Sequence, residues 1–144
     1  MNLPTFQFDI KNKEGKLYIF DIVRKKLVLL TPEEWVRQHF IKYLVYELNY
    51  SKSLIKVESG LKYNQRLKRS DILVCTNQGT PEILIECKST AMPIKQNMFD
   101  QVSIYNKSIQ APYLVITNGL EHYCCFIDFQ HNQITYLDNI PVKK

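Results

Sequence analysis

Two short apolar segments of the sequence contain charged residues at positions where a buried strand rarely accepts them. Asp71 opens the run Asp-Ile-Leu-Val-Cys, and Glu86 and Lys88 close the run Ile-Leu-Ile-Glu-Cys-Lys. A charge in such a segment costs free energy unless it is paired or binds a metal ion. Because side chains alternate along a strand, Glu86 and Lys88 share one face and the side chain of Cys87 lies on the other. These segments therefore predict a charged site on one face of a sheet.

The spacing of the charged residues also predicts how the two strands pair. If residues 78–81 form a four-residue hairpin loop, Asp71 pairs with Lys88 and Pro81 stays outside the ladder. All three charged side chains then share one face, on which directly opposed Cβ atoms are about 5 Å apart. An odd loop without a bulge would separate the two acids. An even register therefore brings two carboxylates and one ammonium group together.

Two carboxylates beside a lysine suit the metal-dependent hydrolysis of phosphodiesters. Hard oxygen ligands hold Mg²⁺, which neutralises charge on a scissile phosphate and activates water. The lysine supplies positive charge to the attacking water and the transition state. Because Mg²⁺ uses few protein ligands, Asp71, Glu86 and one main-chain carbonyl, assigned here to Cys87, are enough. Mn²⁺ is expected to substitute for Mg²⁺ at this site.

The rest of the sequence predicts a mixed sheet flanked by helices. Thr31 and Pro32 provide a cap and a first-turn proline for a helix to about Asn49, and Glu34 stands at the capping-box position. Apolar residues that step by three and four predict a second helix over 94–109. Short apolar runs between turn residues predict strands. The runs are 6–10, 17–23, 27–30, 54–57, 71–76, 82–88, 113–117, 122–129 and 133–137.

The length of 144 residues fits one α/β (α+β) domain with a single core. Residues 1–30 are expected to form an N-terminal β-hairpin extension, and residues 31–144 the main body. The sequence shows neither an export signal nor an apolar run long enough to cross a membrane. Its four cysteines lack metal-ligand spacing, which indicates reduced, buried thiols and a cytoplasmic location. A net charge of +5 favours polyanionic partners such as DNA.

The charged residues and the second helix together resemble a known family of nucleases. Asp71, then Glu86-Cys87-Lys88, then a helix with Gln101 and Tyr105, are similar to the PD-(D/E)xK nuclease superfamily. The spacing is most similar to the N-terminal nuclease domain of the R subunit of type I restriction enzymes, over about residues 31–129. The resemblance implies a restriction-endonuclease-like fold in which the acids bind Mg²⁺ and the lysine assists the water. It also implies that Gln101 and Tyr105 support the site and contact DNA.

The sequence departs from the family pattern in two places. Ser70 stands where the superfamily is named for a proline. The motor that follows the nuclease in type I subunits is missing, so any coupling of cleavage to translocation would come from a separate motor or specificity protein, or would not exist. The resemblance adds a second reading for Glu34, which is either a metal-site acid or the capping-box glutamate. Tyr105 is likewise either a site residue or a core aromatic.

A cluster of cations precedes the first acid. It is either a solvated loop face or a contact surface for DNA phosphates next to the metal site. Its members are Lys62, Arg66, Lys68 and Arg69.

Together, these observations predict a stand-alone, Mg²⁺-dependent endodeoxyribonuclease of a restriction–modification system. One site per protomer means that cutting both strands needs a homodimer or two encounters. The alternative is a DNA-binding or assembly module that keeps the nuclease scaffold and does not cleave. A third reading is a structural domain in which the acids and the lysine form a buried salt-bridge cluster.

Overall fold

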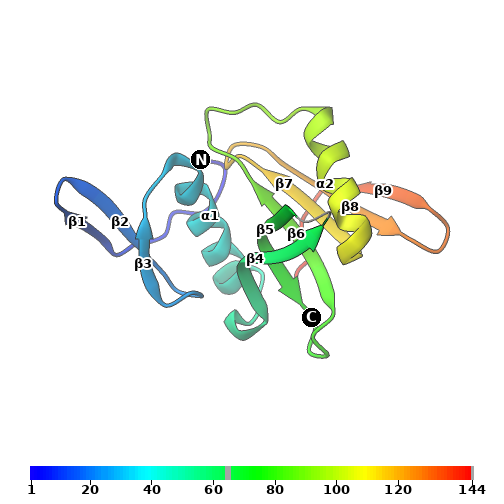
Figure 1. Ribbon diagram of the computed structural model, residues 1–144, viewed down its shortest axis with the longest axis horizontal. Helices are drawn as coiled ribbons and strands as arrows, with labels where there is room; N and C mark the ends of the chain where they lie inside the picture. Colours follow the sequence, from blue (N-terminus) through cyan, green and yellow to red (C-terminus); the bar gives the residue numbers. More distant parts are fainter. Residues whose placement is uncertain (64–65, 144) are drawn as a thin grey trace.

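The computed structural model consists of a six-stranded sheet, a separate three-stranded sheet and two principal helices (Figure 1). It describes the backbone of residues 1–63 and 66–143, and the side chains of residues 1–58 and 71–143. The large sheet has the strand order β4-β5-β6-β7-β8-β9. Its strands are β4 (Ile55–Tyr63), β5 (Arg66–Cys75), β6 (Pro81–Cys87), β7 (Tyr113–Thr117), β8 (His122–Asp128) and β9 (Gln133–Leu137). The predicted mixed sheet flanked by helices is confirmed.

The connection between β6 and β7 determines what covers the sheet. These two strands are parallel, whereas every other neighbouring pair in the described sheet is antiparallel. A parallel pair needs a long crossover, and α2 (Gln96–Ile109) provides it. α2 therefore lies on the same face of the sheet as Leu84, Leu114 and Ile116, which form its apolar contact surface.

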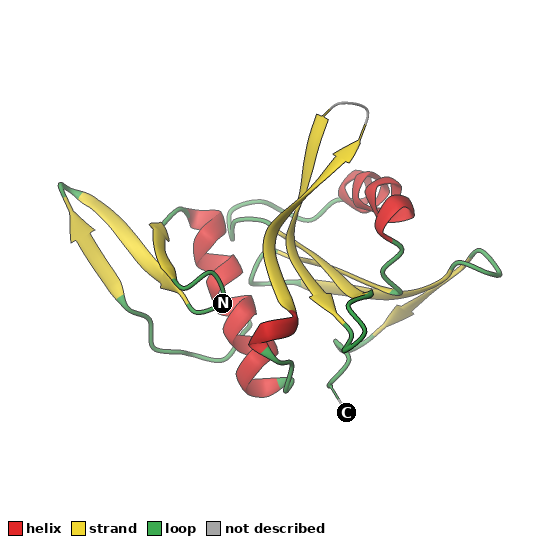
Figure 2. Cartoon of the chain, turned by 60° about the horizontal axis from the view of Figure 1, so that its bottom comes forward, coloured by secondary structure: helices red, strands yellow, loops and turns green. Residues whose placement is uncertain are grey.

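The opposite face of the sheet packs against α1 (Pro32–Lys42) and the π-helical segment η1 (Tyr43–Glu47) (Figure 2). The prediction that this helix runs to about Asn49 is right in extent, but its last turn is π-helical. Asn49 has a left-handed φ of 65°, which ends the helix. A 3-10 turn, η2 (Lys52–Leu54), then leads into β4. The fully buried core residues on this face are Val36, Phe40, Ile41, Leu44, Ile72, Val74, Ile83 and Ile85.

The N-terminal sheet projects beyond α1, away from the large sheet (Figures 1 and 2). It consists of β1 (Ile10–Lys13), β2 (Lys16–Asp21) and β3 (Lys26–Leu29). The predicted first strand over 6–10 is wrong, because β1 begins only at Ile10. The turn is the two-residue Glu14–Gly15, with φ of 53° and 80°. Positive φ at both positions suits a hairpin whose twist matches its strands, and this sets the register.

The pairing of β5 with β6 differs from the predicted register by two residues. Ile72 pairs with Ile85, and a bulge lies between Val74 and Cys75. Pro81 pairs with Cys75, so the prediction that it stays outside the ladder is wrong. A proline is tolerated there because it is the first residue of its strand. A shift of two residues preserves the face on which each side chain lies.

Two further sequence features can be compared with the structure. All four cysteines are free and buried, as predicted. Within the described residues, no helix is both long enough and apolar enough to cross a membrane.

Candidate active site

Asp71, in the middle of β5, lies opposite Glu86, the residue before the last of β6. Because Ile72 pairs with Ile85, the next residue on each strand brings the two carboxyl groups together on the face that α2 covers. Asp71 is 8% exposed. The pairing of Asp71 with Lys88 that the sequence predicted is therefore replaced by a direct Asp71–Glu86 opposition. The prediction that the two acids share one face is confirmed.

Glu86 interacts with both of its charged neighbours. Its Oε1 atom is 3.2 Å from Nζ of Lys88, and its carboxyl group hydrogen bonds with that of Asp71. Burial, and then the negative charge of Asp71, raises the pKa of Glu86 to about 7. Lys88 opposes this shift, and its own pKa is raised: burial acts against the increase, and the charge of Glu86 outweighs it. Near neutral pH, Glu86 is therefore close to half protonated.

Asp71 is held in place by one side chain and one backbone group. Nη2 of Arg37 donates to its Oδ1 at 2.7 Å, and the backbone N–H of Cys87 donates to its Oδ2 at 2.8 Å. Each carboxylate oxygen can accept more than one bond, so both retain capacity for a further ligand. Arg37 reaches Asp71 from α1, on the other side of the sheet from α2.

The backbone of Cys87 faces Asp71, and its side chain does not. Its thiol is fully buried in the core beneath α1, as the strand alternation predicted, and burial raises its pKa well above the usual range. In an extended strand the N–H and C=O of one residue point to the same side. Since the N–H of Cys87 binds Asp71, its carbonyl also points toward the edge of β6 at which Asp71 lies.

Glu34 takes part in a buried ion-pair network rather than facing the acid pair. Its backbone N–H donates to the Thr31 hydroxyl at 3.0 Å, which is half of a capping box. Its carboxylate accepts from Nη1 of Arg37 at 2.5 Å and from Nη2 of Arg24 at 3.0 Å. Gln38 donates to the same carboxylate at 2.9 Å. These cationic and amide donors occupy both oxygens of Glu34.

Glu33 is a site neighbour that the sequence reasoning missed. It lies in the first turn of α1 and is partly buried. Burial, and then the charge of Asp71, raises its pKa, while the charges of Arg37 and Lys88 lower it. Glu33 is therefore an acid of α1 that lies within electrostatic range of the acid pair. The sequence contains a signal for Glu33: it stands four residues before Arg37, so both lie on one face of the helix.

The network around Arg37 extends to the N-terminal sheet. Arg24, at the turn after β2, binds Glu34 and also donates from Nε to Oδ2 of Asp21 at 2.7 Å. Asp21 has no solvent exposure and also accepts from Gln38 at 2.8 Å. An unbroken chain of buried polar contacts thus runs from β2, through α1, to Asp71 in β5.

Of the two predicted residues of α2, one faces the sheet and the other is exposed to solvent. Tyr105 packs against the apolar cluster beneath α2. Gln101 is exposed, four residues earlier on the same helix.

The predicted phosphate contacts belong to strands, whereas the sequence suggested a loop. The backbones of the four basic residues run along β4 and β5, and their side chains lie outside the described residues. They are Lys62, Arg66, Lys68 and Arg69.

The site can act as an oxygen-donor site with few protein ligands. Among the described side chains, no group of three or more His, Cys, Asp or Glu residues is arranged to hold a metal ion. The donors that converge are two carboxylates and one main-chain carbonyl, with a lysine beside them. This set matches the few-ligand, oxygen-only coordination that Mg²⁺ uses when it binds together with a phosphate substrate.

Comparisons with known proteins identify the family and the fold of the chain. The family described as type I restriction enzyme R protein N terminus matches residues 32–141. Among solved structures, the chain resembles a fragment of a protein assigned as the HsdR subunit of a type I restriction enzyme from Vibrio vulnificus YJ016. The TM-score is 0.56 at 20% identity, and the match covers 78% of this chain. It covers 24% of that chain, so the present sequence spans about a quarter of its length.

No curated protein matches the chain. The family match alone extends over more than two thirds of the sequence and includes both acids, the lysine and both helices. The chain therefore belongs to the family of type I restriction enzyme R protein N-terminal domains.

Proposed function

We propose that this domain hydrolyses DNA phosphodiesters in a Mg²⁺-dependent reaction. The observation that carries the proposal is the opposition of Asp71 and Glu86 on neighbouring strands, with Nζ of Lys88 3.2 Å from Glu86. Membership of the restriction enzyme R family supports the same chemistry. In this proposal Asp71, Glu86 and the main-chain carbonyl of Cys87 hold the ion, and Mn²⁺ can replace Mg²⁺.

The donor set fits a hard divalent cation. Two carboxyl groups face each other in a partly dry site, and burial, followed by the charge of Asp71, keeps the pKa of Glu86 near 7 when no cation lies between them. Such crowding disfavours the doubly ionised pair and is relieved when a cation binds. When bound, the ion would neutralise charge on the scissile phosphate and lower the pKa of the attacking water.

The other residues of the site have separate roles in the proposal. Lys88 carries positive charge to the developing negative charge of the transition state, and Glu86 holds its ammonium group in position. Arg37 fixes one oxygen of Asp71 and so orients the carboxylate. Glu33 adds negative charge beside the pair. Gln101 and Tyr105 of α2 support the site and approach the DNA. The phosphates are contacted by Lys62, Arg66, Lys68 and Arg69.

The partners proposed here are DNA and other protein chains. The chain spans about a quarter of the HsdR chain that it resembles, and a motor or specificity protein is a further partner in this proposal. One acid pair per domain cuts one strand at a time, so a double-strand break requires a homodimer or two successive encounters.

One contact favours a second candidate function. The ion pair of Arg37 with Asp71 is buried and would stabilise the fold even if no metal ever bound. A DNA-binding or assembly module that does not cleave would keep this ion pair and lose only the reaction. Cleavage assays separate the two functions, because the module predicts DNA binding without hydrolysis.

Plasmid nicking in the presence and absence of Mg²⁺ tests the proposal. The wild-type chain should nick supercoiled plasmid with Mg²⁺ or Mn²⁺, and chelator should stop the reaction. Lys88→Ala should lower the rate about 100-fold or more, as expected for the loss of one transition-state donor. Lys107→Ala is the matched control, since Lys107 is an exposed lysine in the last turn of α2. Nicking by Lys88→Ala at the wild-type rate would contradict the proposed role of Lys88.

A further inference from the structure

A cavity of about 470 Å³ opens on the α2 face of the sheet and is lined mainly by aromatic rings. Its lining residues are Ile94, Lys95, Gln96, Phe99, Tyr123 and Tyr136. The volume lies within the range of roughly 300–1,000 Å³ that is usual for small-molecule sites. None of these six residues belongs to the acid pair, its lysine or the ion-pair network around Arg37.

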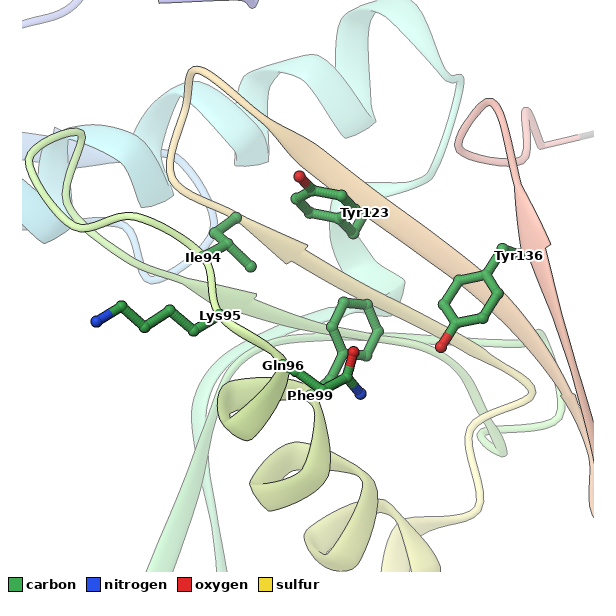
Figure 3. Close-up of a pocket in the computed structure, with 6 residues that line it drawn as sticks. All are labelled: Ile94, Lys95, Gln96, Phe99, Tyr123 and Tyr136. Carbon is green, nitrogen blue, oxygen red and sulfur yellow. The ribbon is translucent and has the colours of Figure 1, made fainter.

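The rings form a partly open platform (Figure 3). Phe99 is 9% exposed and forms the floor, whereas Tyr123 and Tyr136 are 43% and 64% exposed. The ring centroid of Phe99 is 6.2 Å from that of each tyrosine, with interplanar angles of 81° and 69°. Neither tyrosine ring is therefore stacked on Phe99. Much of the surface of both tyrosines remains available to a flat ligand.

The sheet register places this platform close to the acid pair. Glu86 pairs with Ile116 of β7, and Ile116 pairs with Tyr123 of β8, so the three side chains form one row on the α2 face. Two strand spacings amount to about 10 Å. Nucleotides of one DNA strand in a duplex are about 3.4 Å apart along the axis, so this distance corresponds to a few nucleotides.

The charges around the cavity indicate which part of a nucleotide would enter it. Two acids lie at its rim: Gln96 donates to Asp100 at 3.3 Å, and the Tyr123 hydroxyl donates to Glu121 at 3.4 Å. These carboxylates disfavour a phosphate against the rings. Lys95 is exposed, and Figure 3 shows its side chain running away from the rings. An uncharged base therefore suits the cavity, and a backbone phosphate suits the surface near Lys95.

We infer that this cavity binds an unpaired nucleobase of the DNA strand that enters the acid-pair site. The inference rests on the proposed nuclease function and specifies its substrate as DNA with at least one base free of the duplex. Bases stack on aromatic side chains largely without regard to sequence, because each base has a flat π face. Tyr123 and Tyr136 provide the stacking surfaces, and Phe99 holds the platform in position from beneath.

Binding of oligothymidylate by the full chain, measured with chelator present so that no cleavage occurs, tests this inference. Wild-type protein should bind it more tightly than an abasic oligonucleotide of equal length and charge. Tyr123→Leu and Tyr136→Leu should each weaken binding of oligothymidylate roughly 5- to 100-fold, the range expected for losing one stacked base. Binding of the abasic strand should be unchanged.

Tyr46→Leu serves as the control, because Tyr46 is 56% exposed on η1, beneath the opposite face of the sheet. Equal wild-type affinity for the two oligonucleotides would overturn the inference without requiring any variant to fold. Unchanged affinity in folded Tyr123→Leu and Tyr136→Leu would also overturn it. The nicking assay tests the proposed nuclease activity separately from the base site. Base-dependent binding without nicking would contradict the nuclease activity and would still support the base site.

Discussion

The guanidinium of Arg37 donates to the carboxylate of Asp71 at 2.7 Å, joining residues that are 34 positions apart in the sequence. Arg37 comes from α1 and Asp71 from the middle of β5. The same arginine binds Glu34 on its own helix at 2.5 Å. A single side chain therefore connects the first helix to one of the two acids of the candidate active site.

Replacing Arg37 should strongly destabilise the protein. Arg37→Ala leaves Asp71 buried without its cation and leaves Glu34 with Arg24 as its cationic partner, and we expect the free energy of unfolding to fall by about 3–5 kcal/mol. Urea denaturation measures this change. Combining Arg37→Ala with Asp71→Asn should cost less than the sum of the two single changes, because the second removes the charge that the first leaves unpaired. Strict additivity would show that the ion pair contributes little.

We expect the contacts of Arg24 between the N-terminal sheet and the main body to contribute to the free energy of unfolding. Arg24→Ala removes contacts with Asp21, Glu34 and Glu58, of which Asp21 is fully buried. We expect thermal and urea unfolding to show a loss of about 2–4 kcal/mol. Lys26→Ala, at an exposed position of β3, should change stability by less than about 0.5 kcal/mol. If both variants unfold like the wild type, the N-terminal sheet is an independent extension.

Glu86 should make stability depend on pH in the direction opposite to most acids. Its folded pKa of about 7 lies above the ordinary value of 4.5, so the folded state binds the proton more tightly than the unfolded state. This contribution is fully present below pH 4.5 and is lost as pH rises through 7. Glu86→Gln should therefore be more stable than wild type at pH 8, by roughly 1–3 kcal/mol.

Denaturant titrations of Glu86→Gln and wild type at pH 4.5 and pH 8 check this prediction. The stability difference should be large at pH 8 and small at pH 4.5. Saturating Mg²⁺ at pH 8 should also reduce the advantage of Glu86→Gln, since the ion stabilises only the ionised wild-type pair. A stability difference that is the same at both pH values would contradict the raised pKa.

Strand alternation was enough to predict which face carries the acids, but local pattern could not predict their partner residues. The two-residue error in the β5–β6 register combines a different loop with a bulge. Cys75 pairs with Pro81, so the loop spans residues 76–80, and the bulge between Val74 and Cys75 then shifts the register by one residue and sets Ile72 opposite Ile85. Because the error is even, Asp71 and Glu86 stay on one face. Which atoms oppose each other therefore depended on a backbone irregularity that residue type does not encode.

The contacts of α1 were the least predictable part of the site. The cap of α1 is local and is confirmed, because the Thr31 hydroxyl accepts from the N–H of Glu34. The carboxylate of Glu34, which the capping box would turn back to the cap's amide, instead accepts from Arg37, Arg24 and Gln38. The residues that the side chains of Glu34 and Arg37 contact depend on how α1 packs against β5 and the turn after β2. Such long-range packing decides which of two adjacent acids, Glu33 or Glu34, approaches Asp71. Sequence periodicity alone does not distinguish them.

Calorimetric titration of Mn²⁺ and Mg²⁺ into the DNA-free protein at pH 8 tests the central claim most directly. We predict binding of an ion by the wild type, an affinity at least about tenfold weaker for Glu86→Gln, and retained binding by Lys88→Ala. The weaker binding by Glu86→Gln should occur although that variant is folded and more stable. Absence of any binding by the wild type, or equal affinity in Glu86→Gln, would contradict the claim that Asp71 and Glu86 form a metal site.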